Sequence, residues 1–458
     1  MNASGMENEQ TGKVFRKEFL GIALPVTLQC LLQSSFSLID QLMTGQLGEK
    51  SIAAIGLAGN YAFLFSVLLS AIAGAAGIMI AQYAGRKNSR DTSCIFYVSL
   101  LISLAAASLF LLAGVTRTSA LMALYTKDME VQKIAASYLK IVSWTFLPSA
   151  VSMILAVLMR CMDASSAPMA ASFANAGVNT FLNYVLIFGH FGLPALGVRG
   201  AAIASVAGAA AGCALTLILF GRAYRQRGWS MPFSIRLSKA GMKQFAVVLI
   251  PVMICEFLWS LGQNVYSGIY AHISTAAIAA MTLTNPVQSL FIGALSGTAQ
   301  AAGIITGKRL GAGKYEEAYG RSKDMLRYGL AGALTLSLLL ILLGRWYVLL
   351  FAVDDAVRGQ AYLALVVFAV FAPVKVSNMI LGGGILRSGG KTAYVMVIDL
   401  IGTWVCGIPA GYLVAFIWNK PVIWVYFALS LEECVRLIIS LIIFKRKNWM
   451  GTVDKVSG

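Results

Sequence analysis

The segment Ser51-Ile52-Ala53-Ala54 recurs later in the chain as Ala277-Ile278-Ala279-Ala280, at an offset of 226 residues (277 − 51). Two further matches share this offset, Leu24-Pro25 with Ile250-Pro251 and Gly85 with Gly311. Three ungapped matches at one spacing indicate an internal duplication. We therefore expect the second half of the chain to repeat the fold of the first half.

The composition of the chain is that of a membrane protein. Hydrophobic residues make up 58% of the sequence and charged residues 12%, whereas charged residues make up about 25% of soluble domains. A membrane-spanning helix needs roughly 20 mostly apolar residues. Twelve segments qualify, six in each half, at 19–44, 53–82, 94–115, 132–159, 168–188, 197–221, 244–270, 279–306, 325–344, 359–386, 392–417 and 422–444.

The duplication and the number of segments together predict the architecture. Because six is an even number, both copies enter the membrane from the same side, so the pseudo-two-fold axis of the repeat runs along the membrane normal. We expect an all-α integral membrane protein of two six-helix bundles, arranged as the V-shaped lobes of a transporter. The expected parts are a cytoplasmic N-terminal tail (1–18), an N-lobe (19–221), a cytoplasmic linker (222–243), a C-lobe (244–444) and a cytoplasmic tail (445–458).

The net charge of +17 is distributed unevenly between the loops. With an intracellular N-terminus, 25 of the 36 Lys and Arg residues fall in inner segments, 9 in outer loops and 2 within spans. Short cytoplasmic loops accumulate Lys and Arg, so both termini are expected in the cytoplasm. This topology accounts for the positive charge, and we expect no nucleic-acid partner.

Asp40 is the only acidic residue expected at membrane depth in the first half. Asn175, Asn179 and Asn183 are spaced by four residues, so they share one helix face, and we expect this face near Asp40. A carboxylate at depth either takes up a proton or holds a cation such as Na⁺, with amide oxygens completing the shell. Either state suits a coupling-ion site. The alternative is a structural hydrogen bond that holds two helices together.

Six ionisable residues are expected near the middle of the membrane in the second half: Glu256, Lys375, Asp399, Glu432, Glu433 and Arg436. Such residues in a span usually line a cavity or a substrate path, and we expect a charge network there. The network either recognises the charge of a substrate or forms fixed ion pairs that stabilise the lobe. Together with Asp40, five acids face two bases, which favours cationic substrates.

The sequence shows no chemistry of an enzyme or of a resident cofactor. The seven cysteines form no CxxC pair and no metal-ligand spacing. We expect no catalytic residues, no cofactor other than H⁺ or Na⁺ as coupling ion, and no tightly bound metal, with Na⁺ at Asp40 as the one candidate ion. A membrane-embedded enzyme would need paired catalytic groups at depth, and this alternative is disfavoured.

Several motifs resemble the MATE (multidrug and toxic compound extrusion) family, and the resemblance covers almost the whole chain. The motifs are Ile39-Asp40-Gln41-Leu42-Met43-Thr44-Gly45, Gly85-Arg86-Lys87-Asn88, Asn179 to Gly189, Pro251 with Glu256-Phe257-Leu258-Trp259, Leu386-Arg387-Ser388-Gly389-Gly390, and Trp404 with Ile408-Pro409. The fifth motif, with Glu256 and Trp259, resembles a bacterial branch common in Gram-positive organisms. The helix-one Asp of the family falls on Asp40, and its helix-five amides fall on Asn179 and Asn183.

The resemblance implies a secondary antiporter of the bacterial inner membrane. Such a protein exports amphipathic, often cationic compounds in exchange for inward H⁺ or Na⁺. We predict that Asp40, Asn175, Asn179 and Asn183 couple the ion. Substrate charge is assigned to Glu256, Lys375, Asp399, Glu433 and Arg436. The expected partners are small amphipathic cations and membrane lipids, and the expected state is a monomer.

The main alternative is a flippase for a lipid or a lipid-linked oligosaccharide, within the same broader superfamily. A flippase for a pyrophosphate-linked lipid would favour a cavity lined by arginine.

Overall fold

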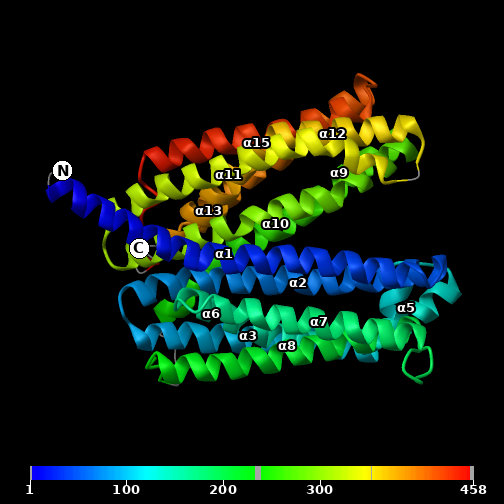
Figure 1. Cartoon of the computed structure of the whole chain (residues 1–458), viewed down its shortest axis with the longest axis horizontal. Helices are drawn as coiled ribbons and strands as arrows, with labels where there is room; N and C mark the ends of the chain where they lie inside the picture. Colours follow the sequence, from blue (N-terminus) through cyan, green and yellow to red (C-terminus); the bar gives the residue numbers. More distant parts are fainter. Residues whose placement is uncertain (1–2, 233–238, 352, 454–458) are drawn as a thin grey trace. The chain divides into compact units, whose positions relative to one another are not determined.

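The computed structural model describes residues 3–232, 239–351 and 353–453, which are almost entirely helical (Figure 1). The first half contains α1 (Ala3–Gly45), α2 (Glu49–Gly85), α3 (Ser89–Thr116), α4 (Thr118–Ala123), α5 (Met129–Val142), η1 (Ser143–Thr145), α6 (Phe146–Cys161), α7 (Ser166–Phe188) and α8 (Val198–Gln226). The second half contains α9 (Lys239–Ile273), α10 (Thr275–Gly311), α11 (Tyr315–Leu349), α12 (Asp355–Asn378), η2 (Met379–Leu386), α13 (Thr392–Asp399), η3 (Leu400–Gly407), α14 (Ile408–Tyr412), η4 (Leu413–Ile417) and α15 (Val422–Lys445).

Ten helices among the described residues are long and apolar enough to cross a membrane. The other two predicted spans correspond to α7 and α15. Their polar residues explain the difference: α7 carries the three asparagines, and α15 carries Glu432, Glu433 and Arg436. The two helices least suited to lipid by composition are therefore those that hold much of the candidate site chemistry.

The described chain divides into two compact units. One, called here the N-unit, contains Leu28–Ile80 and Lys87–Ser238. The other, called here the C-unit, contains Met1–Thr27, Ala81–Arg86 and Lys239–Gly458. Helices α7 and α8 run side by side in the N-unit, as do α12 and α15 in the C-unit (Figure 1). Of the predicted linker and tails, residues 1–2, 233–238 and 454–458 lie outside the described residues.

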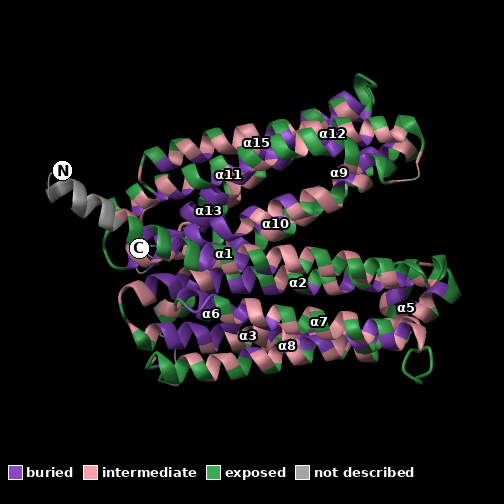
Figure 2. Ribbon diagram, in the orientation of Figure 1, coloured by how far each residue is buried: buried purple, intermediate pink, exposed green. Residues whose placement is uncertain are grey.

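Hydrophobic contacts explain why the start of α1 belongs to the C-unit. Phe15, Phe19, Ile22 and Ala23 are buried in one core cluster with residues of α10, α11, α12 and α15. Buried residues of this unit gather around α13 and the C-terminal end of α10 (Figure 2). Burying large apolar side chains is worth roughly 1.5–3 kcal/mol each, so this cluster ties the start of α1 to the C-unit.

The ends of α2 and α10 meet in a reciprocal contact between repeat-equivalent residues. A Cβ atom added to Gly85 would lie 2.7 Å from the carbonyl carbon of Lys308, and one added to Gly311 would lie 2.7 Å from that of Gln82. Lys308 follows Gln82 by 226 residues, as Gly311 follows Gly85. The glycines of the repeat are therefore needed for close backbone approach.

Residues 447–453, called here the C-terminal strap, pack against the C-unit within the region expected to be a tail. Trp449 is 0% exposed and donates its indole N–H to the Phe444 carbonyl at 3.2 Å. The Gln82 side chain donates to the Ser388 carbonyl at 2.6 Å and accepts from the Val453 N–H at 2.7 Å. The strap thus holds the end of α2 and the 387–390 loop through buried hydrogen bonds.

Candidate functional site

In the N-unit, the structure brings Asp40 and Asn183 together. The Asn183 side-chain amide donates to Asp40 Oδ1 at 2.5 Å and to Asn179 Oδ1 at 3.3 Å. Asn183 is 0% exposed, and its own Oδ1 is buried with no partner among the described residues. The Asp40 site therefore combines a carboxylate with an unused amide oxygen.

Helices α5 and α8 extend this site beyond the predicted residues. Asn179 donates to Ser205 Oγ on α8 at 3.3 Å, and the Tyr138 side chain of α5 lies near Ser205. Gly208 allows α8 to approach this face, because a Cβ there would lie 2.9 Å from the Cβ of Asn179. Ser205 and Tyr138 were missed because single hydroxyl groups in spans give no spacing signal in a sequence.

Asn175 lies apart from this group and lines a separate cavity of the N-unit. This cavity, called here the Arg160 cavity, has a volume of about 430 Å³. The predicted face of three asparagines is therefore divided, with Asn179 and Asn183 at Asp40 and Asn175 in the cavity. Arg160, in the last turn of α6, lines the same cavity and is only 8% exposed.

In the C-unit, two arginines organise the predicted carboxylates. Arg387 pairs with Glu256 at 3.3 Å and with Asp399 at 3.9 Å. Arg436 pairs with Asp399 at 3.7 Å and with Glu432 at 3.4 Å. The predicted network exists, and Asp399 joins its two halves.

The rest of this charged cluster is held by hydrogen bonds. Tyr266 donates to Glu432 at 2.5 Å, and Asn378 donates to Glu433 Oε2 at 2.9 Å. Arg436 also contacts the Thr403 hydroxyl. Among the described residues, the Lys375 ammonium group has no carboxylate within 4.0 Å, so Lys375 joins the cluster only at longer range.

Local backbone geometry makes room for the arginine and glutamate side chains. The segments η2 and η3 are π-helical, a form that is rare and frequent at functional sites. Within η3, a Cβ atom at Gly402 would collide with the Arg436 side chain, and one at Gly407 would lie 2.8 Å from the Tyr266 hydroxyl. Glycine at these two positions is therefore required by the charged cluster.

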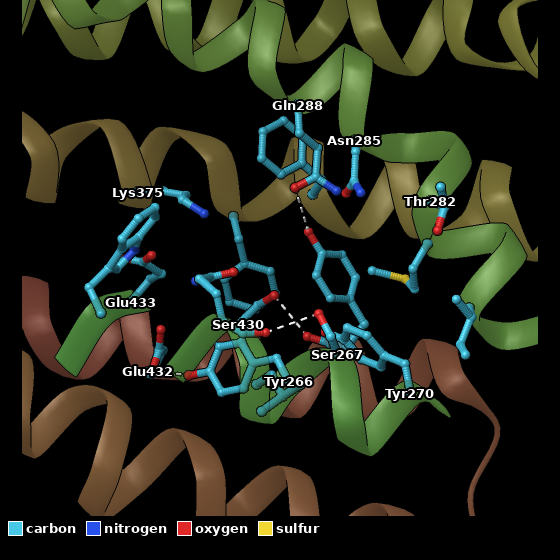
Figure 3. Close-up of a pocket in the computed structure, with 18 of the residues that line it drawn as sticks. Tyr266, Ser267, Tyr270, Thr282, Asn285, Gln288, Lys375, Ser430, Glu432 and Glu433 are labelled. Carbon is cyan, nitrogen blue, oxygen red and sulfur yellow. Dashed lines mark hydrogen bonds between the residues drawn. The ribbon is translucent and has the colours of Figure 1, made fainter. Parts of the chain in front are cut away.

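Two cavities flank the charged cluster. The Tyr266 cavity has a volume of about 180 Å³ and is lined by aromatic residues together with Lys375, Glu432, Glu433 and Arg436. Figure 3 shows the hydrogen bond between Tyr266 and Glu432, which both line this cavity. The Arg387 cavity, about 320 Å³, contains Glu256, Asp399 and Arg387. Four residues line both cavities: Trp259, Lys375, Glu433 and Arg436. The charged cluster thus forms the partition between the two cavities.

The structure changes the charge balance expected from sequence. The C-unit cluster contains four acids and three bases, because Arg387 joins Lys375 and Arg436. In the N-unit, Arg160 is buried at the C-terminal end of α6. Arg387 and Arg160 thus add two bases beside the five acids and two bases that the sequence predicts at depth. Each of these arginines lies near the end of a predicted span, where basic residues are common.

Comparison with known proteins identifies the family. The MatE family model matches residues 25–185 and 251–413, and the two matches start 226 residues apart. The probable multidrug resistance protein NorM of Thermotoga maritima is 23% identical over 438 residues, covering 95% of this chain and 93% of that protein.

Solved structures share the fold. A crystal structure of a MATE protein in complex with MaL6 has a TM-score of 0.86 at 16% identity, covering 95% of this chain and 97% of that one. A MOP superfamily transporter from Pyrococcus furiosus, described as having reversed binding-pocket polarity that suggests a different function, has a TM-score of 0.85 at 17% identity, covering 95% and 96%.

These matches confirm the predicted all-α fold of two six-helix bundles, because MATE structures have twelve spanning helices in two lobes. The family model covers well over half of the chain. Members of the family are transporters and not enzymes, as predicted. The chain therefore belongs to the MatE family of multi-pass membrane transporters.

Proposed function

We propose that this protein is a secondary antiporter that exports amphipathic, cationic drugs or xenobiotics in exchange for inward H⁺ or Na⁺. The observation that carries the proposal is the Asp40–Asn183 pair, a lone carboxylate that bridges α1 and α7 inside the N-unit. The relatives named as probable multidrug resistance proteins support the export of drugs. An ion can drive such export only if it binds the two conformations of the transporter unequally.

The Asn183 amide supplies a means for this difference. Its N–H group faces Asp40, while its Oδ1 is buried and has no partner in the part of the chain that the structure describes. Without a bound ion, the amide N–H stabilises the charged carboxylate. A protonated Asp40 is a hydrogen-bond donor, and Na⁺ prefers oxygen ligands. In either case a rotated Asn183 amide presents its Oδ1 in place of its N–H group. Ion loading then changes the bond between α1 and α7.

Replacement of Asp40 tests this mechanism. Asp40→Asn removes the ionisable group, so efflux of a cationic dye from cells should fall to the level of cells without the transporter. Asp128→Asn is the matched control, because Asp128 is an exposed helix cap and Asn caps equally well. Dye export by Asp40→Asn at the wild-type rate, with equal expression, would contradict the proposal. Efflux from liposomes under a pH gradient alone, and then a Na⁺ gradient alone, identifies the ion.

The C-unit supports recognition of cationic substrates. Its cluster has one more acid than bases, and the Tyr266 cavity places aromatic rings beside Glu432 and Glu433. Aromatic faces and carboxylates both attract organic cations. We therefore assign substrate charge recognition to this cavity, with amphipathic cations and membrane lipids as partners of a monomeric protein.

We also propose a location in the bacterial inner membrane, with both termini in the cytoplasm. The excess of Lys and Arg in alternate loops supports this orientation. Single cysteines introduced at Gly192 and at Gly228, in a cysteine-free background, should label from opposite sides of intact cells. Labelling of both positions from outside would contradict the orientation.

A lipid flippase is the second candidate. It is favoured by one observation, the presence of Arg387, Arg436 and Lys375 around the Arg387 cavity. A flippase would move a fluorescent anionic lipid between leaflets of a proteoliposome without an ion gradient. An antiporter would leave that lipid in place and would move a dye only with a gradient.

A further inference from the structure

The Arg160 cavity of the N-unit differs in chemistry from the cavities of the C-unit. Helices α1, α2, α6, α7 and α8 supply its walls. Nine uncharged polar side chains line it, including Gln33, Ser152, Asn175 and Thr216. Among the described residues that line the cavity, Arg160 is the only ionisable one. The electrostatic character of this cavity is therefore positive.

Buried hydrogen bonds orient the polar groups around Arg160. The Arg160 guanidinium donates to Gln29 Oε1 at 2.8 Å, and Gln29 Nε2 donates to Ser172 Oγ at 2.7 Å. Gln29 is itself 9% exposed, so this chain of donors is fixed inside the unit. The arrangement uses both the acceptor and a donor of the Gln29 amide.

We propose that the Arg160 cavity binds the anionic group of an amphipathic ligand, with a carboxylate or a phosphate as the recognised chemistry. A buried guanidinium attracts an anion more strongly than an exposed one, because the local dielectric constant is low. Its planar fork also matches both oxygens of such a group. A volume of about 430 Å³ is that of a cavity for a small organic molecule.

This inference rests on the proposed export function and deepens it by naming a second feature of the substrates. Asp40 does not line this cavity, and Asn175 lies one helical turn from Asn179 of the Asp40 site. Ion coupling and anion recognition therefore occupy separate places in the N-unit. The substrate class becomes amphiphiles that carry an anionic group in addition to the cationic one, that is, zwitterions.

The test compares a fluorescent fatty acid, 11-(dansylamino)undecanoic acid, with its methyl ester. Binding to purified full-length protein in detergent is measured by dansyl fluorescence, without any transport. The wild type should bind the acid about tenfold or more tightly than the ester. Arg160→Gln should bring the ratio of dissociation constants close to 1, whereas Arg225→Gln, an exposed arginine on α8, should leave it unchanged.

Further variants keep the proposal testable if Arg160→Gln does not fold. Arg160→Lys keeps the charge and loses the fork, so acid affinity should fall while a preference for the acid persists. A monodisperse Arg160→Gln or Arg160→Lys protein with wild-type affinity for both probes overturns the proposal. Asp40→Asn should retain the wild-type ratio even though its transport is lost, which separates this test from that of the export function.

The source of the anionic group is distinguished by competition. Dihexanoyl phosphatidic acid should displace the dansyl acid from the wild type if the cavity takes lipid headgroups. If the cavity takes soluble carboxylates, octanoate should displace it and the lipid should not. Failure of both competitors would contradict anion binding in this cavity.

Discussion

Asn183 on α7 donates its side-chain amide to Asp40 on α1 at 2.5 Å, although 143 residues separate them in sequence. Because the Asn183 side chain is fully buried, replacing either residue leaves the other without this hydrogen-bond partner. It also links α1, the helix whose residues are shared between the two units, to the interior of the N-unit.

Replacing Asn183 should therefore destabilise the protein more than replacing its neighbours on α7. Asn183→Ala removes a hydrogen bond to a charged group, worth about 1.5–3 kcal/mol, and should lower the thermal unfolding midpoint. Asn175→Ala is the control on the same helix face, since Asn175 lines a cavity instead. Equal shifts in the two variants, measured by fluorescence-detected melting in detergent, would argue against a special role of the pair.

The reciprocal contact of α2 and α10 predicts equal effects at equivalent positions. Gly85→Ala and Gly311→Ala each place a methyl group against a backbone carbonyl and should cost about 1–3 kcal/mol. Gly59→Ala on α2 and Gly320→Ala on α11 meet no atoms within 4 Å and should be neutral or slightly stabilising. A melting shift at Gly85 without one at Gly311 would contradict the symmetry of this contact.

The charged cluster predicts a compensating pair of substitutions. Arg387→Met leaves Glu256 and Asp399 without a shared partner; because these pairs are half-buried, the loss should be smaller than the cost of breaking a fully buried pair, about 3–5 kcal/mol. Glu256→Gln in the same chain should recover part of the loss, because it removes the carboxylate charge that pairs with Arg387, whereas Asp399 keeps its pair with Arg436. Arg446→Met, at an exposed position, is the control for the loss of a positive charge. Additive losses in the double variant, measured by melting, would show that Arg387 and Glu256 are not coupled.

The C-terminal strap should contribute strongly to stability. Trp449→Ala empties a fully buried site and should cost about 3–5 kcal/mol. Trp418→Ala is the matched control, since Trp418 is 58% exposed. If both variants melt at the wild-type temperature, residues 447–453 do not hold the C-unit together.

Much of the helical framework could be predicted from sequence, because the length of the apolar segments, their hydropathy and the 226-residue repeat each indicate membrane-spanning helices. The predicted segments correspond to the helices that the structure describes, including α7 and α15 despite their polar residues. What could not be predicted is the assignment of segments to units. Packing of Phe15 and Phe19 in the C-unit is a long-range contact, and no local pattern in α1 encodes it.

The candidate site was only partly predictable. Asp40 with Asn183, and Asp399 with Arg436, follow from charge at depth and from helical spacing. Arg160 and Arg387 did not, because an arginine near a span end has the same sequence context whether its long side chain reaches solvent or turns inward. The choice depends on neighbours such as Gln29 and Glu256, which lie 131 residues away in each case.

The C-terminal strap has a consequence for how the chain is made. The Gln82 side chain is synthesised early, yet two of its partners, Gly451 and Val453, are synthesised 369 and 371 residues later. Until then the end of α2 carries a buried amide without these partners. A chain cut before Trp449 would keep the membrane-spanning helices that the structure describes, and it would leave the buried Gln82 side chain without these two hydrogen bonds.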